Sequence, residues 1–131
     1  MNSPSNVGLI KVTIDQLFIH GVEDAGSVFD KQDPALIITV GDQILKTQRI
    51  QEGGVTAVFS EVFEVMANYS DKITVQVVNM DGFGFTKAKI GSGDTKIYQA
   101  VPNIDDQVTY VIKLKNSKGL HQGICQMVFM L

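Results

Sequence analysis

Residues 33–46 read Asp-Pro-Ala-Leu-Ile-Ile-Thr-Val-Gly-Asp-Gln-Ile-Leu-Lys, and this stretch indicates the fold more clearly than any other. Proline cannot donate a hydrogen bond within a sheet and is tolerated where a strand begins, so a buried strand is expected from Ala35 to Val40. Gly41-Asp42 is typical of a two-residue turn, because glycine accepts a positive φ. The stretch therefore predicts an antiparallel β-hairpin whose second strand covers residues 44–50.

Length and composition indicate one domain without disulfides. The chain has 131 residues, which is enough to bury a core, and its only cysteine, Cys125, has no partner for an internal disulfide. The net charge of −3 lacks the excess of Lys and Arg that nucleic-acid binders show, so we expect no nucleic-acid partner. Because no apolar run reaches about 18 residues and no basic-then-apolar leader is present, we expect a cytoplasmic protein.

Alternating apolar residues predict further strands along the chain. Ile10, Val12 and Ile14 share one face, and the apolar phase then shifts beyond Gln16, which predicts a bulge or a strand end there. Further strand patterns cover residues 58–66, 73–78, 90–98, 108–114 and 123–131. With the hairpin these make about eight strands without a helical period, which predicts an all-β fold, an eight-stranded antiparallel Greek-key β-sandwich. We expect residues 1–7 to form a flexible tail and residues 8–131 a single domain.

A series of short motifs, taken in order, resembles the C2 domains over residues 8–131. The motifs are Asp33-Pro34 at a strand start, Lys46-Thr47 at the next strand end, Val-Phe-Ser-Glu-Val-Phe-Glu-Val at 58–65, Val-Val-Asn-Met-Asp at 77–81, and Ile90-Gly91 after the loop. Each motif alone is weak, and their order and spacing make the match more specific. Because the first strand leads directly into an acidic loop and a further strand follows residues 108–114, the order resembles the permuted variant called type II.

Calcium-binding C2 domains take carboxylate ligands from two loops at one end of the sandwich, and the resemblance transfers only part of that set. Asp33 and Asp81 match ligand positions, whereas Asn79 stands where an aspartate is usual and Lys87 falls near the last ligand position. Since ligand charge sets calcium affinity, we expect no cofactor and interpret Asp33 and Asp81 as acceptors for loop amides. The alternative is calcium-dependent phospholipid binding by a reduced site, whose candidate ligands are Asp24, Asp30, Asp33, Asn79 and Asp81.

The same two loops carry apolar residues that favour contact with a membrane or a protein partner. Phe83 and Phe85 alternate with glycines in the second loop, and Val28-Phe29 occupies the first loop. Large apolar groups on a loop tip suggest a docking surface, and neighbouring Lys87 and Lys89 make an anionic membrane more attractive. Phe29 could equally fold back over the end of the sandwich.

Two weaker signals complete the functional interpretation. Lys46 matches the lysine-lined face that C2 domains also use for lipids, and Arg49 lies nearby in the sequence. His20 and His121 belong to no recognisable triad or metal motif, and Cys125 lies in an apolar strand, so we expect no enzyme. We therefore expect a C2-like module, which could be one domain of a larger protein, that docks without calcium on a lipid surface or a protein partner. The apolar tip favours lipid, whereas the overall acidic charge favours protein.

Overall fold

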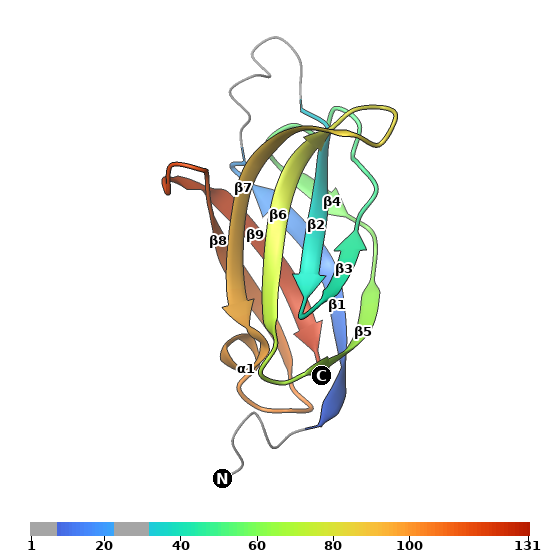
Figure 1. Cartoon of the computed structure of the whole chain (residues 1–131), viewed down its shortest axis with the longest axis vertical. Helices are drawn as coiled ribbons and strands as arrows, with labels where there is room; N and C mark the ends of the chain where they lie inside the picture. Colours follow the sequence, from blue (N-terminus) through green and yellow to red (C-terminus); the bar gives the residue numbers. More distant parts are fainter. Residues whose placement is uncertain (1–7, 23–31) are drawn as a thin grey trace.

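The computed structural model describes residues 8–22 and 32–131. In this part of the chain nine strands and one short helix follow one another (Figure 1): β1 (Leu9–His20), β2 (Pro34–Val40), β3 (Gln43–Lys46), β4 (Ala57–Phe59), β5 (Phe63–Asn68), β6 (Lys72–Met80), β7 (Thr86–Lys96), α1 (Ile97–Ala100), β8 (Gln107–Lys115) and β9 (His121–Met130). The predicted all-β antiparallel fold is confirmed. The described strands number nine because the predicted strand 58–66 is divided into β4 and β5. No helix within the described ranges has the length and apolar character needed to cross a membrane.

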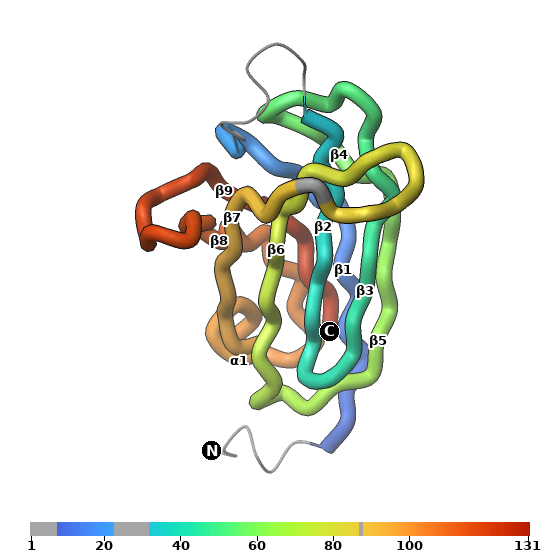
Figure 2. The backbone as a smooth tube through the Cα atoms, turned by 45° about the horizontal axis from the view of Figure 1, so that its top comes forward, coloured from blue at the N-terminus to red at the C-terminus, as the bar shows by residue number. Residues whose placement is uncertain are grey.

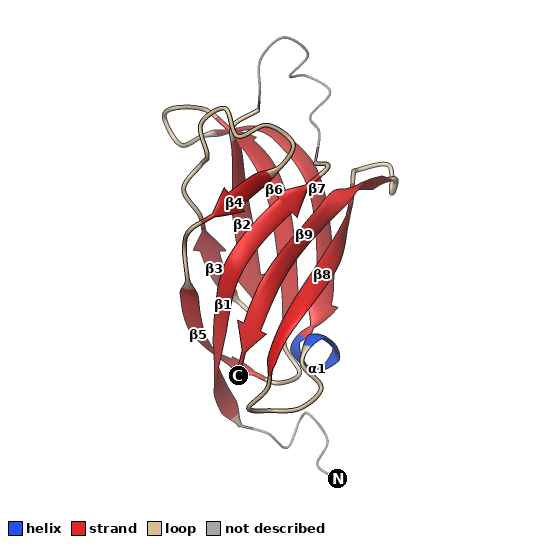
Figure 3. Ribbon diagram, turned by 180° about the vertical axis from the view of Figure 1, so that it is seen from behind, coloured by secondary structure: helices blue, strands red, loops and turns tan. Residues whose placement is uncertain are grey.

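The strands form one curled sheet that folds over into two layers (Figure 3). The hydrogen-bonded order is β3-β2-β6-β7-β8-β9-β1-β4, and β5 also pairs with β1. Among the described residues, β7 and β8 are joined by the pair Ser92 and Lys115 alone. This narrow connection is the seam between the layer β3-β2-β6-β7 and the layer formed by β8, β9, β1, β4 and β5.

The core lies between the two layers. Its largest fully buried side chains include Ile14, Leu17, Leu36, Ile38, Phe59, Ile73, Leu114, Met127 and Phe129, which come from both layers. Each such side chain contributes about 1.5–3 kcal/mol when it leaves water completely. The alternation of buried and exposed residues along each strand therefore fixes which strand face meets the opposite layer.

The predicted bulge in β1 is confirmed. Gln16 has a φ of +52°, and the pairing of β1 with β9 shifts register between Asp15 and Phe18. The buried phase moves there from Ile14 to Leu17, and both of these side chains are completely buried. Across β1, the partner strand is interrupted over residues 60–62, between β4 and β5. The bulge thus lets one long strand keep its apolar side on the core past an irregular pairing.

The hairpin is confirmed, but its second strand is shorter than predicted. Gly41 has a φ of +60°, and Val40 pairs with Gln43 across the two-residue turn. β3 ends at Lys46 rather than Ile50, because the amide of Leu36 donates to the Thr47 hydroxyl (2.9 Å) instead of to a backbone carbonyl. The chain then continues toward the end of the sandwich where β2 begins.

The strand predicted over residues 90–98 is also placed differently. β7 begins four residues earlier, at Thr86, and ends at Lys96, where the one-turn helix α1 starts. Ile97 and Ala100 of α1 are buried, so the apolar spacing at this point reflects a helical turn that closes the bottom of the core (Figure 1).

Candidate docking site at the loop end

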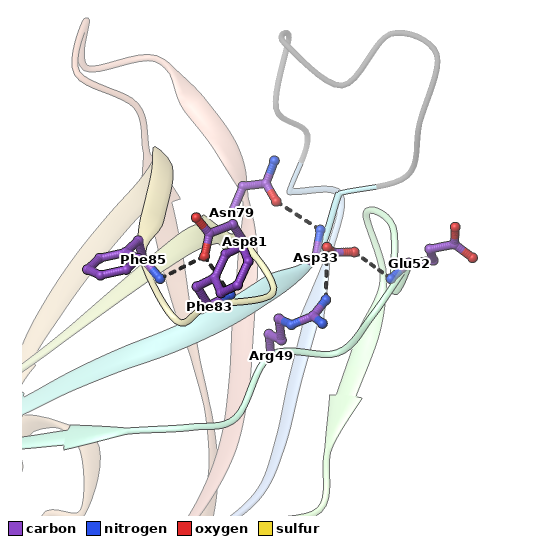
Figure 4. A network of polar contacts seen from close by, with 7 residues as sticks. All are labelled: Asp33, Arg49, Glu52, Asn79, Asp81, Phe83 and Phe85. Carbon is purple, nitrogen blue, oxygen red and sulfur yellow. Dashed lines mark hydrogen bonds and ion pairs between the residues drawn. The ribbon is translucent and has the colours of Figure 1, made fainter.

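The loops after β3 and β6 meet the start of β2 at one end of the sandwich (Figure 2). Asp33 stands immediately before β2, and both oxygens of its carboxylate are engaged (Figure 4). The Nη1 of Arg49 lies 3.0 Å from Oδ2, and the amide of Glu52 donates to Oδ1 at 2.6 Å. The side chains of Arg49 and Asp33 are only 27% and 18% exposed. The aspartate therefore accepts a loop amide, as expected, and also holds a guanidinium, which was not expected.

Asn79 fixes the end of β6 to the start of β2. Its side-chain oxygen accepts a hydrogen bond from the amide of Asp33 at 2.9 Å, and the amide of Met80 donates to the Asp33 carbonyl at 3.0 Å. The Asn79 side chain is buried, with 4% of the residue exposed. A neutral amide suits this place because it satisfies a buried backbone donor.

Asp81 closes the loop that carries the two phenylalanines. Its Oδ1 accepts hydrogen bonds from the amides of Phe83 (2.8 Å) and Phe85 (3.0 Å), and its own amide donates to the Phe85 carbonyl at 2.9 Å. Gly84 has a φ of +87°, which favours glycine at this position. Phe83 is 88% exposed and Phe85 is 70% exposed. The loop is thus ordered by its own hydrogen bonds while both rings face solvent.

Arg49 links the first of these groups to the phenylalanine loop. A Cβ placed on Gly82 would lie 3.4 Å from Nη2 of Arg49, so the guanidinium lies against the loop 81–85 as well as on Asp33. From its place in the sequence, Arg49 was predicted to lie on the lysine-lined face with Lys46. The structure places it at the loop end, whereas Lys46 is exposed at the end of β3. The contact of Arg49 with Asp33 depends on the early end of β3, which no local pattern indicates.

The remaining predicted site residues divide into two groups. Asp24, Val28, Phe29 and Asp30 lie outside the described residues, as does the side chain of Lys87. Lys89 is exposed on β7, where it pairs with Val78 and lines a groove with Ser92 and Lys115. Within the described ranges no group of three or more His, Cys, Asp or Glu residues could hold a metal ion. That statement does not cover the acidic residues of segment 23–31.

Comparison with solved structures identifies the fold. The first C2 domain of plant Extended Synaptotagmin 1 matches with a TM-score of 0.73 and 14% identity, covering 91% of each chain. A C2 domain-containing protein from a putative elicitor-responsive gene matches with a TM-score of 0.74 and 14% identity, covering 100% of this chain and 94% of that chain. Human GIVD cytosolic phospholipase A2 matches with a TM-score of 0.75 and 12% identity, covering 95% of this chain but 16% of that chain.

No family model matches the sequence, and no curated protein matches it. The strand order nevertheless agrees with the type II arrangement inferred above, since β9 follows β8 and pairs with both β8 and β1. The resemblance to C2 domains is therefore confirmed as a likeness of fold. The chain has the fold of a C2 domain.

Proposed function

We propose that this protein is a non-catalytic module that docks on membranes through the loop 81–85, without calcium. The observation that carries the proposal is the exposure of Phe83 (88%) and Phe85 (70%) on a loop that Asp81 holds closed. Large apolar side chains kept in solvent at a loop tip favour a docking surface. The C2 fold of extended synaptotagmins and of a phospholipase adds support by analogy. In this proposal the protein is cytoplasmic and peripheral to the membrane.

The energy available from the tip is modest. Full removal of both rings from water is worth about 3–6 kcal/mol, because each phenylalanine contributes about 1.5–3 kcal/mol. A binding free energy of about 4 kcal/mol corresponds to a Kd of about 1 mM. The hydrogen bonds of Asp81 reduce the cost of ordering the loop, but they add no contact with lipid. Docking therefore needs a second contribution, which Lys87 and Lys89 supply on an anionic surface in this proposal.

The state of Asp33 supports calcium independence. Calcium binding requires several free carboxylate oxygens. Both oxygens of Asp33 already have protein partners, and one partner is the cationic Arg49. A calcium ion at Asp33 would have to displace this guanidinium. The loop end thus already holds a cation that belongs to the chain.

Co-sedimentation with vesicles of phosphatidylcholine and phosphatidylserine, in EGTA and in millimolar calcium, tests the proposal. We expect equal binding in both conditions and loss of binding in the variant Phe83→Ala/Phe85→Ala. The matched control is Ile44→Ala/Val58→Ala, which removes side chains that are 63% and 62% exposed elsewhere. Binding that requires calcium would support the alternative of a reduced calcium site. Binding that survives the loss of both phenylalanines would refute tip insertion.

A protein-interaction role is the second candidate, and one surface favours it. On the outer face of the layer formed by β8, β9, β1 and β4, Val111, Gln126, Phe18 and Val58 stand in register across neighbouring strands. Val58 is 62% exposed and Val111 is 44% exposed. Absence of vesicle binding under every condition would favour this surface over the loop tip.

A further inference from the structure

A groove lies at the seam where β7 and β8 bring the two layers together, away from the exposed end of β3 that carries Lys46. It encloses about 140 Å³. Its lining residues, here called the seam groove, are Gln76, Lys89, Ile90, Gly91, Ser92, Lys115, Asn116 and Ser117. Since a water molecule occupies about 30 Å³ in the liquid, the groove has room for a group of several heavy atoms.

Two glycines explain why β7 and β8 approach each other so closely at the seam. A Cβ on Gly93 would lie 2.3 Å from the carbonyl oxygen of Lys113, and a Cβ on Gly91 would lie 3.4 Å from the Cβ of Leu114. A side chain at Gly93 would therefore push the strands apart. In the described part of the chain the pairing of β7 with β8 is limited to Ser92 and Lys115, so the two strands diverge beside this pair and their flanking residues line a groove.

The seam groove is rich in hydrogen-bond donors and carries positive charge. Lys89 and Lys115 supply ammonium groups, while Ser92 and Ser117 supply hydroxyls. None of the lining residues is acidic. The ion pairs found in the described part of the chain join Lys11 to Glu64, Arg49 to Asp33 and Lys72 to Asp94, so neither groove lysine is neutralised by a described carboxylate.

The turn that forms one wall of the groove is held by its own hydrogen bonds. Oδ1 of Asn116 accepts from the amides of Lys118 (2.9 Å) and Leu120 (3.1 Å). The amide of Gly119 donates to the Asn116 carbonyl at 2.9 Å, and Gly119 has a φ of +78°. Ser117 is therefore presented by an ordered turn, which lowers the entropic cost of binding a ligand there.

We propose that the seam groove binds the phosphate group of a phosphate monoester. Two ammonium groups with hydroxyl and amide donors complement an oxyanion, and lysine is a common phosphate ligand. The turn after β8 and the loop 81–85 lie toward the same end of the sandwich (Figure 1). A phosphorylated lipid headgroup and a soluble phosphate ester present the same chemistry to this site. The proposal goes beyond membrane docking and does not require it.

The first experiment is a titration of the ¹⁵N-labelled protein with glycerol phosphate, followed by NMR at constant ionic strength. We expect saturable shifts centred on the amides of Ser92, Lys115 and Ser117. The variant Lys89→Gln/Lys115→Gln weakens binding by about tenfold or more, since it removes both charged donors. The control Lys11→Gln/Lys96→Gln, which removes the same charge from exposed positions, leaves the affinity within about twofold. Retained spectra confirm that each variant is folded.

The second experiment identifies the source of the phosphate. Vesicles that contain a phosphatidylinositol monophosphate are compared with phosphatidylserine vesicles of equal charge, using the same variants. Preference for the phosphorylated lipid that is lost in Lys89→Gln/Lys115→Gln assigns the groove to a headgroup. Binding of glycerol phosphate without such a preference assigns it to a soluble ester. Unsaturable shifts spread over all lysines would overturn the proposal, and because the first experiment contains no membrane, that failure would leave docking by Phe83 and Phe85 unaffected.

Discussion

The contact between Arg49 and Asp33 makes a quantitative prediction. The Nη1 to Oδ2 distance is 3.0 Å, and the two side chains are 27% and 18% exposed. Exposed pairs contribute about 0.2–1 kcal/mol, whereas loss of one partner from a fully buried pair costs about 3–5 kcal/mol. This partly buried pair lies between those limits. We therefore expect Arg49→Gln to lower the free energy of unfolding by about 2 kcal/mol.

The corresponding change in melting temperature follows from chain length. With about 2.1 cal/mol/K of unfolding entropy per residue, a chain of 131 residues loses about 7 °C for 2 kcal/mol. Because the chain has no tryptophan, far-UV circular dichroism in urea is the suitable measurement. The control is Lys11→Gln, since Lys11 and Glu64 lie 3.9 Å apart with side chains 63% and 61% exposed. That variant should change the free energy of unfolding by less than about 0.5 kcal/mol.

A double-mutant cycle separates the pair from other effects of each substitution. In Asp33→Asn the new amide group would face the donors of Arg49, while the other oxygen could still accept from Glu52. We expect a coupling energy of about 1–2 kcal/mol between Arg49→Gln and Asp33→Asn, because each removes the same charged contact. A coupling energy near zero, or equal costs for Arg49→Gln and Lys11→Gln, would refute the view that Arg49 organises the loop end.

Three further predictions concern the core and the seam. Gly93→Ala should lower the free energy of unfolding by more than about 2 kcal/mol in urea melts, because its Cβ would lie 2.3 Å from the Lys113 carbonyl oxygen. Burial raises the pKa of Cys125 to about 12, so at pH 8 a disulfide reagent should modify the thiol in urea but not in the native protein. Burial first, and then the charge of Asp106, raises the pKa of Tyr69 above its ordinary 10.0. The unfolded chain then loses the phenol proton first, so the free energy of unfolding should fall as pH rises beyond about 10, and a Tyr69→Phe variant should lack this part of the decline.

Local signals explain which parts of the fold could be predicted from sequence. Pro34 and Gly41 restrict their own backbone, so the hairpin follows from them alone. The phase shift at Gln16 likewise predicts the bulge, because period-two burial makes any extra residue visible. The end of β3 could not be predicted in the same way. It depends on the Thr47 hydroxyl reaching the amide of Leu36 on another strand.

The candidate sites were predicted less completely, because they depend on long-range register. Asp81 accepts amides within five residues of itself, and its interpretation as a loop acceptor needed no tertiary information. Arg49 and Asp33 are 16 residues apart, and their contact requires the chain after β3 to return to the loop end. The seam groove requires Ser92 to stand opposite Lys115, a pairing between strands separated by α1. Neither arrangement leaves a periodic pattern in the sequence.

An internal cation at the loop end changes what can regulate docking. In a calcium-dependent site, acidic loops repel one another until the ion arrives, so the ion controls both charge and order. Here Arg49 is part of the chain, and it neutralises Asp33 at every calcium concentration. Asp81 meanwhile orders the tip without any ion, through two amides of its own loop. If Phe83 and Phe85 insert into a membrane as proposed, the equilibrium then depends on the membrane itself. Anionic charge acts on the lysines near the tip, and a phosphorylated headgroup acts on the seam groove.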